Sequence, residues 1–170
     1  MPSTAVSTSI EPTRREQQYL QQQPTYPSLN GLPQVWAKAA EQFGDTLALL
    51  DPHAEPEVSF TYRQLWDTIQ QFASGLQALG IQPETHVALF SENQPRWFIA
   101  DQGIMAAGAI DVVRSSQADR DELLYILENS DATALVIEHQ KALDNLMEHL
   151  GNLPIELVIL LSDEEPAGDS

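Results

Sequence analysis

The sequence predicts an α/β fold with a mostly parallel sheet covered by helices and a short β-hairpin near its start. Three observations support this fold class. From position 87 onward, continuous apolar runs recur between amphipathic segments, as expected for strands that are buried on both faces of a parallel sheet. Two earlier apolar runs are separated by a polar, proline-containing segment typical of a wide turn. Capping residues and glycines then mark the ends of several intervening helices.

The first ordered element is expected to begin at Leu32. Residues 1–31 are rich in Ser, Thr, Gln and Pro and lack periodicity, so they are predicted to be a disordered tail. From Leu32 to Phe43 the apolar residues recur at intervals of three and four, which predicts a helix ended by Gly44. The hairpin follows, with strands at 47–50 and 58–60.

The next helix has the clearest local signals. Thr61 and Gln64 have the spacing of a capping box, in which each side chain satisfies a free backbone donor at the helix start. An apolar face continues to Leu79, and Gly80 ends the helix. After a strand at 87–90, a helix over 94–107 is expected to be capped by Asn93 or Gln94 with Pro95 in its first turn. This helix is apolar on most sides, which predicts deep burial.

The rest of the chain alternates in the same way. Asp119 and Glu122 are expected to cap a helix that includes 123–127. Further strands are predicted at 109–113, 135–137 and 157–161, with a helix at 140–150. The predicted organisation is therefore a tail (1–31), one α/β domain (32–162) and a polar end (163–170).

Composition excludes several classes of function. The 25 acidic and 8 basic residues give a net charge of −17, which repels polyanions and excludes a basic nucleic-acid-binding face. Acid concentrates toward the C-terminus, and the interpretation is a solvated surface, with a docking face for a basic partner as the alternative. The absence of Cys excludes disulfides and thiolate metal sites. No apolar run reaches the ~18 residues of a transmembrane segment, and no secretory signal is apparent.

Two residues are candidates for substrate binding because ligands of open α/β sheets bind beside the carboxyl ends of strands. Arg114 follows a predicted strand and could orient a bound ligand, although pairing with a local carboxylate is the favoured interpretation. Trp97 could line a ligand-binding cavity, although a place in the core is favoured. Arg96 lies at a similar junction, and Asp101 and Gln102 are expected to satisfy nearby backbone groups.

The histidines do not predict a metal site. None has a partner at the three- or four-residue spacing of helical metal ligands, so surface or strand-end positions are expected. The four residues are His53, His86, His139 and His149.

Two long segments carry a family resemblance. They are FTYRQLWDTIQQFASGLQALGIQPETHVALFSENQPRWFIADQGIMAAGAIDVVRSS (60–116) and DRDELLYILENSDATALVIE (119–138). Together they resemble the N-terminal quarter of adenylate-forming acyl-activating enzymes, especially long-chain fatty acyl-CoA and acyl–acyl-carrier-protein synthetases. Many members have a proline-containing strand where this chain has 111–114 followed by two serines. This departure is more similar to the acyl–acyl-carrier-protein synthetases of cyanobacteria and plastids. The resemblance covers about residues 32–162.

The resemblance implies a reaction for the complete enzyme. ATP, with Mg²⁺, activates a fatty acid to acyl-AMP, and the thiol of CoA or acyl carrier protein then displaces AMP. The family's phosphate loop and catalytic Lys belong to segments beyond Ser170, so no catalytic, cofactor-binding or metal residue is assigned in this chain. The isolated chain is expected to be inactive, with the remainder of the ligase as a partner on a separate chain. A self-standing α/β interaction module is the alternative. A cytoplasmic location is expected, with peripheral membrane association and a plastid left open.

Overall fold

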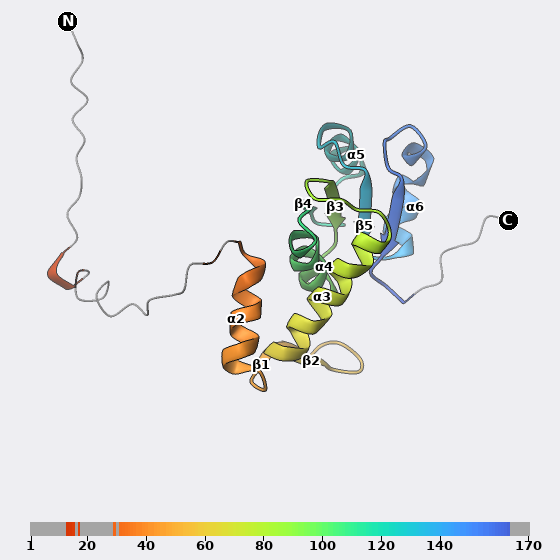
Figure 1. Cartoon of the computed structure of the whole chain (residues 1–170). Helices are drawn as coiled ribbons and strands as arrows, with labels where there is room; N and C mark the ends of the chain where they lie inside the picture. The colour runs from red at the N-terminus through yellow and green to blue at the C-terminus, as the bar shows by residue number, and fades with distance from the viewer. Residues whose placement is uncertain (1–12, 16, 18–28, 30, 164–170) are drawn as a thin grey trace, which may run out of the picture.

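The computed structural model describes residues 13–15, 17, 29 and 31–163 (Figure 1). Nearly all of the predicted tail and polar end lie outside these ranges. The chain first forms helix α2 and a hairpin, and then alternates helix and strand. The elements are α2 (Pro33–Phe43), β1 (Leu47–Asp51), β2 (Val58–Thr61), α3 (Tyr62–Ala78), β3 (His86–Phe90), α4 (Pro95–Ala106), β4 (Ile110–Arg114), α5 (Arg120–Asn129), β5 (Ala134–Ile137), α6 (Gln140–Leu150) and β6 (Leu157–Leu160).

Strands β3 to β6 form a four-stranded parallel sheet in the order β4-β3-β5-β6. The central strand β3 pairs with β4 on one side and β5 on the other, so that Val87 lies opposite Asp111 and Ala134. The residues of β5 are all buried, which explains their continuous apolar sequence. The sheet, its helices and the separate antiparallel β1–β2 hairpin confirm the predicted fold class.

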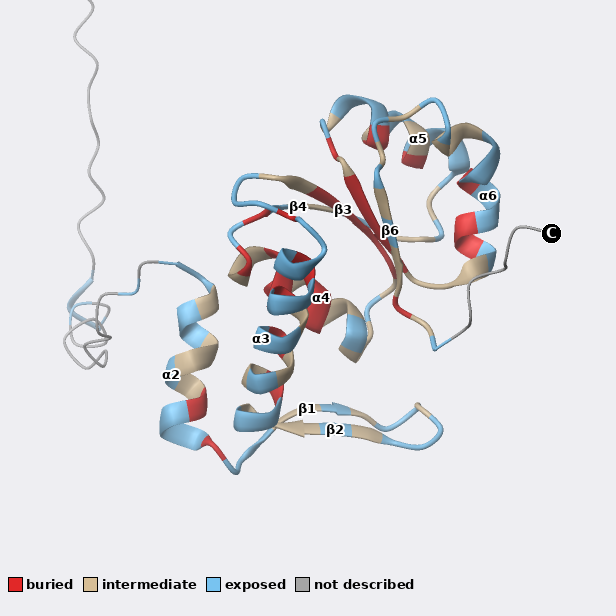
Figure 2. Cartoon of the chain, turned by 45° about the vertical axis from the view of Figure 1, so that its right-hand side comes forward, coloured by how far each residue is buried: buried red, intermediate tan, exposed pale blue. Residues whose placement is uncertain are grey.

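The two faces of the sheet carry different helices (Figures 1 and 2). Val87 and Leu89 point to the face covered by α3 and α4, where they pack in one apolar cluster with Leu76 and Ile104. The alternate residues of β3 pack on the other face with α5 and α6. The second cluster includes Ala88, Phe90, Leu127, Leu135 and Leu146. The sheet is therefore the middle layer of three.

A third cluster attaches α2 and the hairpin to the outer side of α3 and α4. Its buried residues are Leu65, Ile69 and Ile99, with aromatic rings around them. The rings of Trp36 and Phe98 meet edge to face, with centroids 5.0 Å apart. This packing holds the hairpin beside the N-terminal end of α4, where a cavity described below forms.

Some predicted helix ends are confirmed and others are wrong. The Thr61 capping box is present: Thr61 Oγ1 accepts from Gln64 N at 3.3 Å, and Gln64 Oε1 accepts from Thr61 N at 2.9 Å. Gly80 has a φ of 96°, as expected where a helix has just ended. Gln94 and Asp119 occupy N-cap positions but make no side-chain cap hydrogen bond.

Gly44 is the C-cap of α2, as predicted, but its φ of −32° is right-handed, so the left-handed freedom of glycine is not used there. Helix α6 begins at an unforeseen cap, because His139 Nδ1 accepts a hydrogen bond from Ala142 N at 3.0 Å. Helix α4 is deeply buried, as predicted from its apolar sequence. None of the helices in the described part of the chain is both long and apolar enough to span a bilayer.

Candidate functional site

Polar side chains gather where β3, β4 and β5 end. We call Glu92, Gln94, Ser115, Ser116 and Glu138 the carboxyl-end cluster. Its residues lie in the segments that follow these three strands, and the carboxyl ends of parallel strands share one edge of a sheet. The backbone ladder continues just past the strands, since Glu138 N donates to Phe90 O at 2.9 Å. This continuation fixes the positions of the loops that carry the cluster.

The cluster is a connected hydrogen-bond network. Ser115 Oγ donates to the Glu92 carboxylate, and Ser116 Oγ donates to the Glu138 carboxylate. Glu138 also accepts from the backbone N of Glu92 at 3.2 Å and from Gln94 Nε2 at 3.5 Å. Each carboxylate is thereby tied to the loop of a neighbouring strand. The network braces three loops at the edge where α/β sheets bind ligands.

A cavity of about 320 Å³ lies beside this network. Ser116 and Glu138 line it together with the start of α6, including His139 and Lys141. Because Nδ1 of His139 accepts the cap hydrogen bond, a neutral His139 carries its proton on Nε2. The wall of this cavity thus combines a carboxylate, a hydroxyl, an imidazole and an ammonium group.

Arg114, one of the two predicted substrate-binding residues, lies at the end of β4 in an ion pair. Its Nε donates to Glu122 Oε1 of α5 at 2.7 Å. The pair raises the pKa of Arg114 through its hydrogen bond and the charge of Glu122. The guanidinium is exposed, so the ion pair contributes little to stability. This is the local carboxylate pairing that the sequence analysis favoured.

Trp97, the other predicted residue, is half-buried on the opposite face of the sheet. It packs against the cluster between the sheet and α3 and α4. It also lines a cavity of about 360 Å³ between the hairpin and the start of α4, with His53 and Phe98 among the other lining residues. The structure therefore does not bring Arg114 and Trp97 together.

Arg96 anchors the end of the last strand. Its guanidinium donates to the backbone O of Leu161 and to Asp163, each at 2.5 Å. The hydrogen bond from Arg96 lowers the pKa of Asp163, and the same pair raises that of Arg96. Arg96 thus closes the β6 side of the carboxyl edge.

A row of polar side chains joined by hydrogen bonds runs past α4 and ends beside Asp111 of β4, and the sequence does not predict the place of Asp111 next to it. Gln102 Oε1 accepts from Trp36 Nε1 at 2.6 Å, and Gln102 Nε2 donates to Asp101 Oδ2 at 2.6 Å. The partners of Gln102 are therefore side chains rather than the expected backbone groups. Asp101 in turn lies beside Asp111 of β4. Burial, reinforced by the neighbouring Asp101 carboxyl, raises the pKa of Asp111 to about 8.

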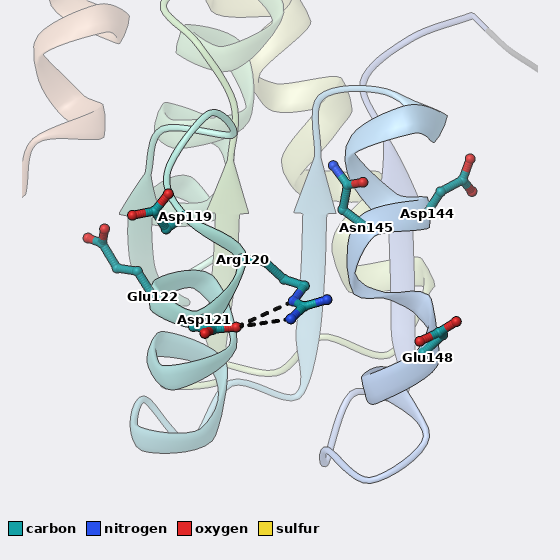
Figure 3. A pocket seen from close by; sticks show the side chains of 7 residues that line it. All are labelled: Asp119, Arg120, Asp121, Glu122, Asp144, Asn145 and Glu148. Carbon is teal, nitrogen blue, oxygen red and sulfur yellow. Dashed lines mark hydrogen bonds and ion pairs between the residues drawn. The ribbon is translucent and has the colours of Figure 1, made fainter.

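An acidic groove of about 760 Å³ lies between α5 and α6 (Figure 3). Asp119, Asp121 and Glu122 line it from the α5 side, and Asp144 and Glu148 from α6. Arg120 reaches back to Asp121 at 3.3 Å. In the described ranges no three or more His, Cys, Asp or Glu side chains are placed to hold a metal ion.

The signal for the carboxyl-end cluster was present but incomplete. The sequence places Arg114 directly after a predicted strand, whereas Glu138 is not singled out there, although it directly follows the buried strand β5. Strand-end position alone does not reveal which loops touch. That information depends on the order of strands in the sheet.

A layered parallel sheet with polar loops at its carboxyl edge defines the class of α/β ligand-binding domains. The sequence profile of one such class, described as AMP-binding enzyme, matches residues 36–170. The chain therefore belongs to the AMP-binding enzyme family, and its architecture is that of the N-terminal part of the adenylate-forming domain.

Two curated relatives come from Arabidopsis thaliana. The chain is 38% identical over 135 residues to the chloroplastic long-chain-fatty-acid–[acyl-carrier-protein] ligase AEE15. The matched segment covers 79% of this chain and 19% of the relative. It is 39% identical over 135 residues to the probable acyl-activating enzyme 16, also chloroplastic, with the same coverage. The chain thus spans about a fifth of the length of these relatives.

Two solved structures share the fold. The long-chain-fatty-acid-CoA ligase FadD1 from Archaeoglobus fulgidus superposes with a TM-score of 0.71 at 24% identity, over 84% of this chain and 30% of that one. The N-terminal domain of FACL13 from Mycobacterium tuberculosis superposes with a TM-score of 0.70 at 20% identity, over 84% of this chain and 39% of that one. Both similarities concern the fold alone.

Proposed function

We propose that this chain is the N-terminal portion of a ligase that activates long-chain fatty acids. The complete enzyme joins a fatty acid to a thiol through acyl-AMP, using ATP and Mg²⁺. The observation that supports this most strongly is the 38% identity to a chloroplastic fatty-acid ligase over 79% of the chain. A shared sequence over most of a domain is stronger support than a shared fold, because one fold serves many functions.

The chain contributes a braced sheet edge rather than the reacting groups. The carboxyl-end cluster holds the loops after β3, β4 and β5 in fixed positions. Trp97 contributes an aromatic wall to the cavity beside the hairpin, which suits an acyl chain. Arg114 orients the acyl or phosphopantetheine group when the complete site is present. The ATP and Mg²⁺ sites are assigned to the remainder of the ligase, and the 170-residue chain alone is inactive.

The similarity to AEE15 favours acyl carrier protein over CoA as the thiol substrate. The departure at 111–114 supports the same choice. We assign the complete enzyme to the cytoplasm, and the chloroplastic names of both Arabidopsis relatives support a plastid as the alternative compartment.

Complementation tests this function. The 170-residue chain is co-expressed with the part of AEE15 that follows its matched segment, and palmitate, ATP and MgCl₂ are added. Trapping of acyl-AMP with hydroxylamine is expected for the pair and not for either part alone. A chain that is monodisperse, unfolds cooperatively and gives no acyl-AMP with the complementing part would overturn the proposal. That outcome would support a self-standing interaction module.

Two variants test the predicted residues in the complemented enzyme. Trp97→Leu is expected to raise KM for palmitate with little change in kcat, since it shortens a binding wall. Arg114→Gln is expected to lower kcat/KM for the thiol substrate. Arg120→Gln is the matched control, because Arg120 also pairs with an α5 carboxylate but lies in the acidic groove. Equal effects of the two arginine variants would remove Arg114 from the site.

A further inference from the structure

Strand β4 forms a free edge of the sheet. It is the terminal strand of the order β4-β3-β5-β6 and pairs with β3 alone. Two of its apolar residues are unusually open: Ile110 is 44% exposed and Val113 is 43% exposed. An uncovered strand edge presents unpaired backbone groups that can pair with a further strand.

An acidic side chain lies inside this edge. Asp111 is opposite Val87, so it points to the face covered by α3 and α4. Both of its carboxylate oxygens are inaccessible to solvent and have no hydrogen-bond partner among the described residues. Its charged neighbour is another acid, Asp101 of α4. In the described part of the chain, neither carboxylate takes part in an ion pair.

The cation at the end of β4 does not relieve this arrangement. Arg114 lies three positions from Asp111, so it points to the opposite face, and it already pairs with Glu122. Burying a carboxylate without a cation or hydrogen-bond donors is costly. At neutral pH Asp111 is therefore held in its protonated form beside the Asp101 carboxyl group, and no cation from the described residues pairs with either side chain.

We propose that the β4 edge receives an additional strand that carries Lys or Arg opposite Asp111, and that Asp111 and Asp101 together select this cation. Directly opposite residues in neighbouring strands have Cβ atoms about 4.5–5.5 Å apart, within reach of an ammonium or guanidinium group. The open Ile110 and Val113 provide the apolar part of the same interface.

A second copy of this chain does not fit the edge. In antiparallel pairing of two β4 strands, only residues on the same face lie opposite each other, which places Asp111 against Asp111 or Val113 of the other copy. Neither supplies a cation, and each copy carries a net charge of −17. The occupant is a strand from the remaining four-fifths or so of the ligase, so the identity of the occupant rests on the proposed function.

The test uses one substitution, Asp111→Asn, which is expected to raise the stability of the isolated chain and to weaken its binding to the rest of the ligase. In the isolated chain the variant is expected to be more stable at pH 8, because a neutral amide replaces a buried carboxylate. In the complex with the co-expressed C-terminal part of AEE15, the variant is expected to bind at least tenfold more weakly, because the cation loses its partner. Asp131→Asn is the matched control, since Asp131 is an exposed turn residue with a φ of 55° that Asn also adopts.

The readouts are dissociation constants from sedimentation equilibrium and melting curves by circular dichroism. If Asp111→Asn binds the AEE15 part as tightly as wild type or more tightly, the proposal is overturned. A strand without a cation opposite position 111 would pair at least as well with the neutral Asn. Failure of the wild-type chain to bind the AEE15 part would also overturn it. Binding is measured without acyl-AMP formation, so a complex that assembles but does not catalyse contradicts the proposed function alone.

Discussion

The Asp111→Asn substitution is expected to remove a pH dependence of stability from the isolated chain. The native pKa of Asp111 is about 8, against 3.8 ordinarily. Between these values the native carboxyl holds a proton that the unfolded chain has released. The free energy of unfolding therefore decreases as pH rises from about 4 to about 8. An Asn at this position does not titrate, so the variant lacks this slope.

The size of the effect follows from the shift. Each pKa unit corresponds to about 1.4 kcal/mol, so the interval from pH 5 to pH 8 has a ceiling of roughly 4 kcal/mol. Residue Asp111 as a whole is only half-buried, although its carboxylate oxygens are covered, so we take about half of this ceiling. We expect the variant to gain about 2 kcal/mol over wild type between pH 5 and pH 8.

The assay is urea unfolding at several pH values, followed by tryptophan fluorescence, with Asp131→Asn as the control. The stability difference between Asp111→Asn and wild type should grow steadily as the pH rises from 5 to 8. Parallel stability curves, or a variant that is less stable than wild type at pH 8, would refute the burial of an ionisable Asp111 beside Asp101.

Three further predictions concern helix packing, helix capping and the core, and each is measured by thermal or urea unfolding. Gly103→Ala places a Cβ 2.7 Å from Phe72 Cδ1, so it should lower the stability of the chain by about 1–3 kcal/mol. Gly75→Ala meets no atom within 4 Å and should raise the stability by about 0.5–1 kcal/mol. Equal effects of the two variants would contradict the close approach of α3 and α4. Thr61→Ala should cost about 1 kcal/mol by removing the cap of α3, and Thr61→Ser should restore most of it. Leu127→Ala should cost about 2–5 kcal/mol because Leu127 is fully buried, and a loss below 1 kcal/mol would show that α5 is not packed on the sheet.

Local patterns in the sequence determined much of the fold. Apolar spacing located the helices and strands, and the Thr61–Gln64 pair identified the start of α3, because these signals depend on residues within a few positions of one another. The α/β class and the hairpin followed from the order of these elements. The burial of α4 followed from its composition.

The contacts that build the candidate site required three-dimensional information. Ser116 and Glu138 are 22 positions apart and meet only because β4 and β5 lie on either side of β3. The Trp36–Gln102 hydrogen bond joins residues 66 positions apart. The alternation of side chains along β4 is enough to place Asp111 on the face covered by α4. It does not show that Asp111 lies beside Asp101. A predicted side-chain cap is absent where the residue has a competing partner, as Gln94 does with Ser91 Oγ at 3.2 Å.

The strand order has a consequence for synthesis of the chain. Of the four strands in the parallel sheet, β3 is synthesised first. Its two neighbours, β4 and β5, are synthesised later and pair with opposite edges of β3. The side of β3 that pairs with β5 therefore stays open on the ribosome until Ile137 is made, about two dozen residues after β4 ends. At roughly 5–20 residues per second this interval lasts about 1–5 s. During that time a nascent chain with an exposed apolar strand is a substrate for chaperones.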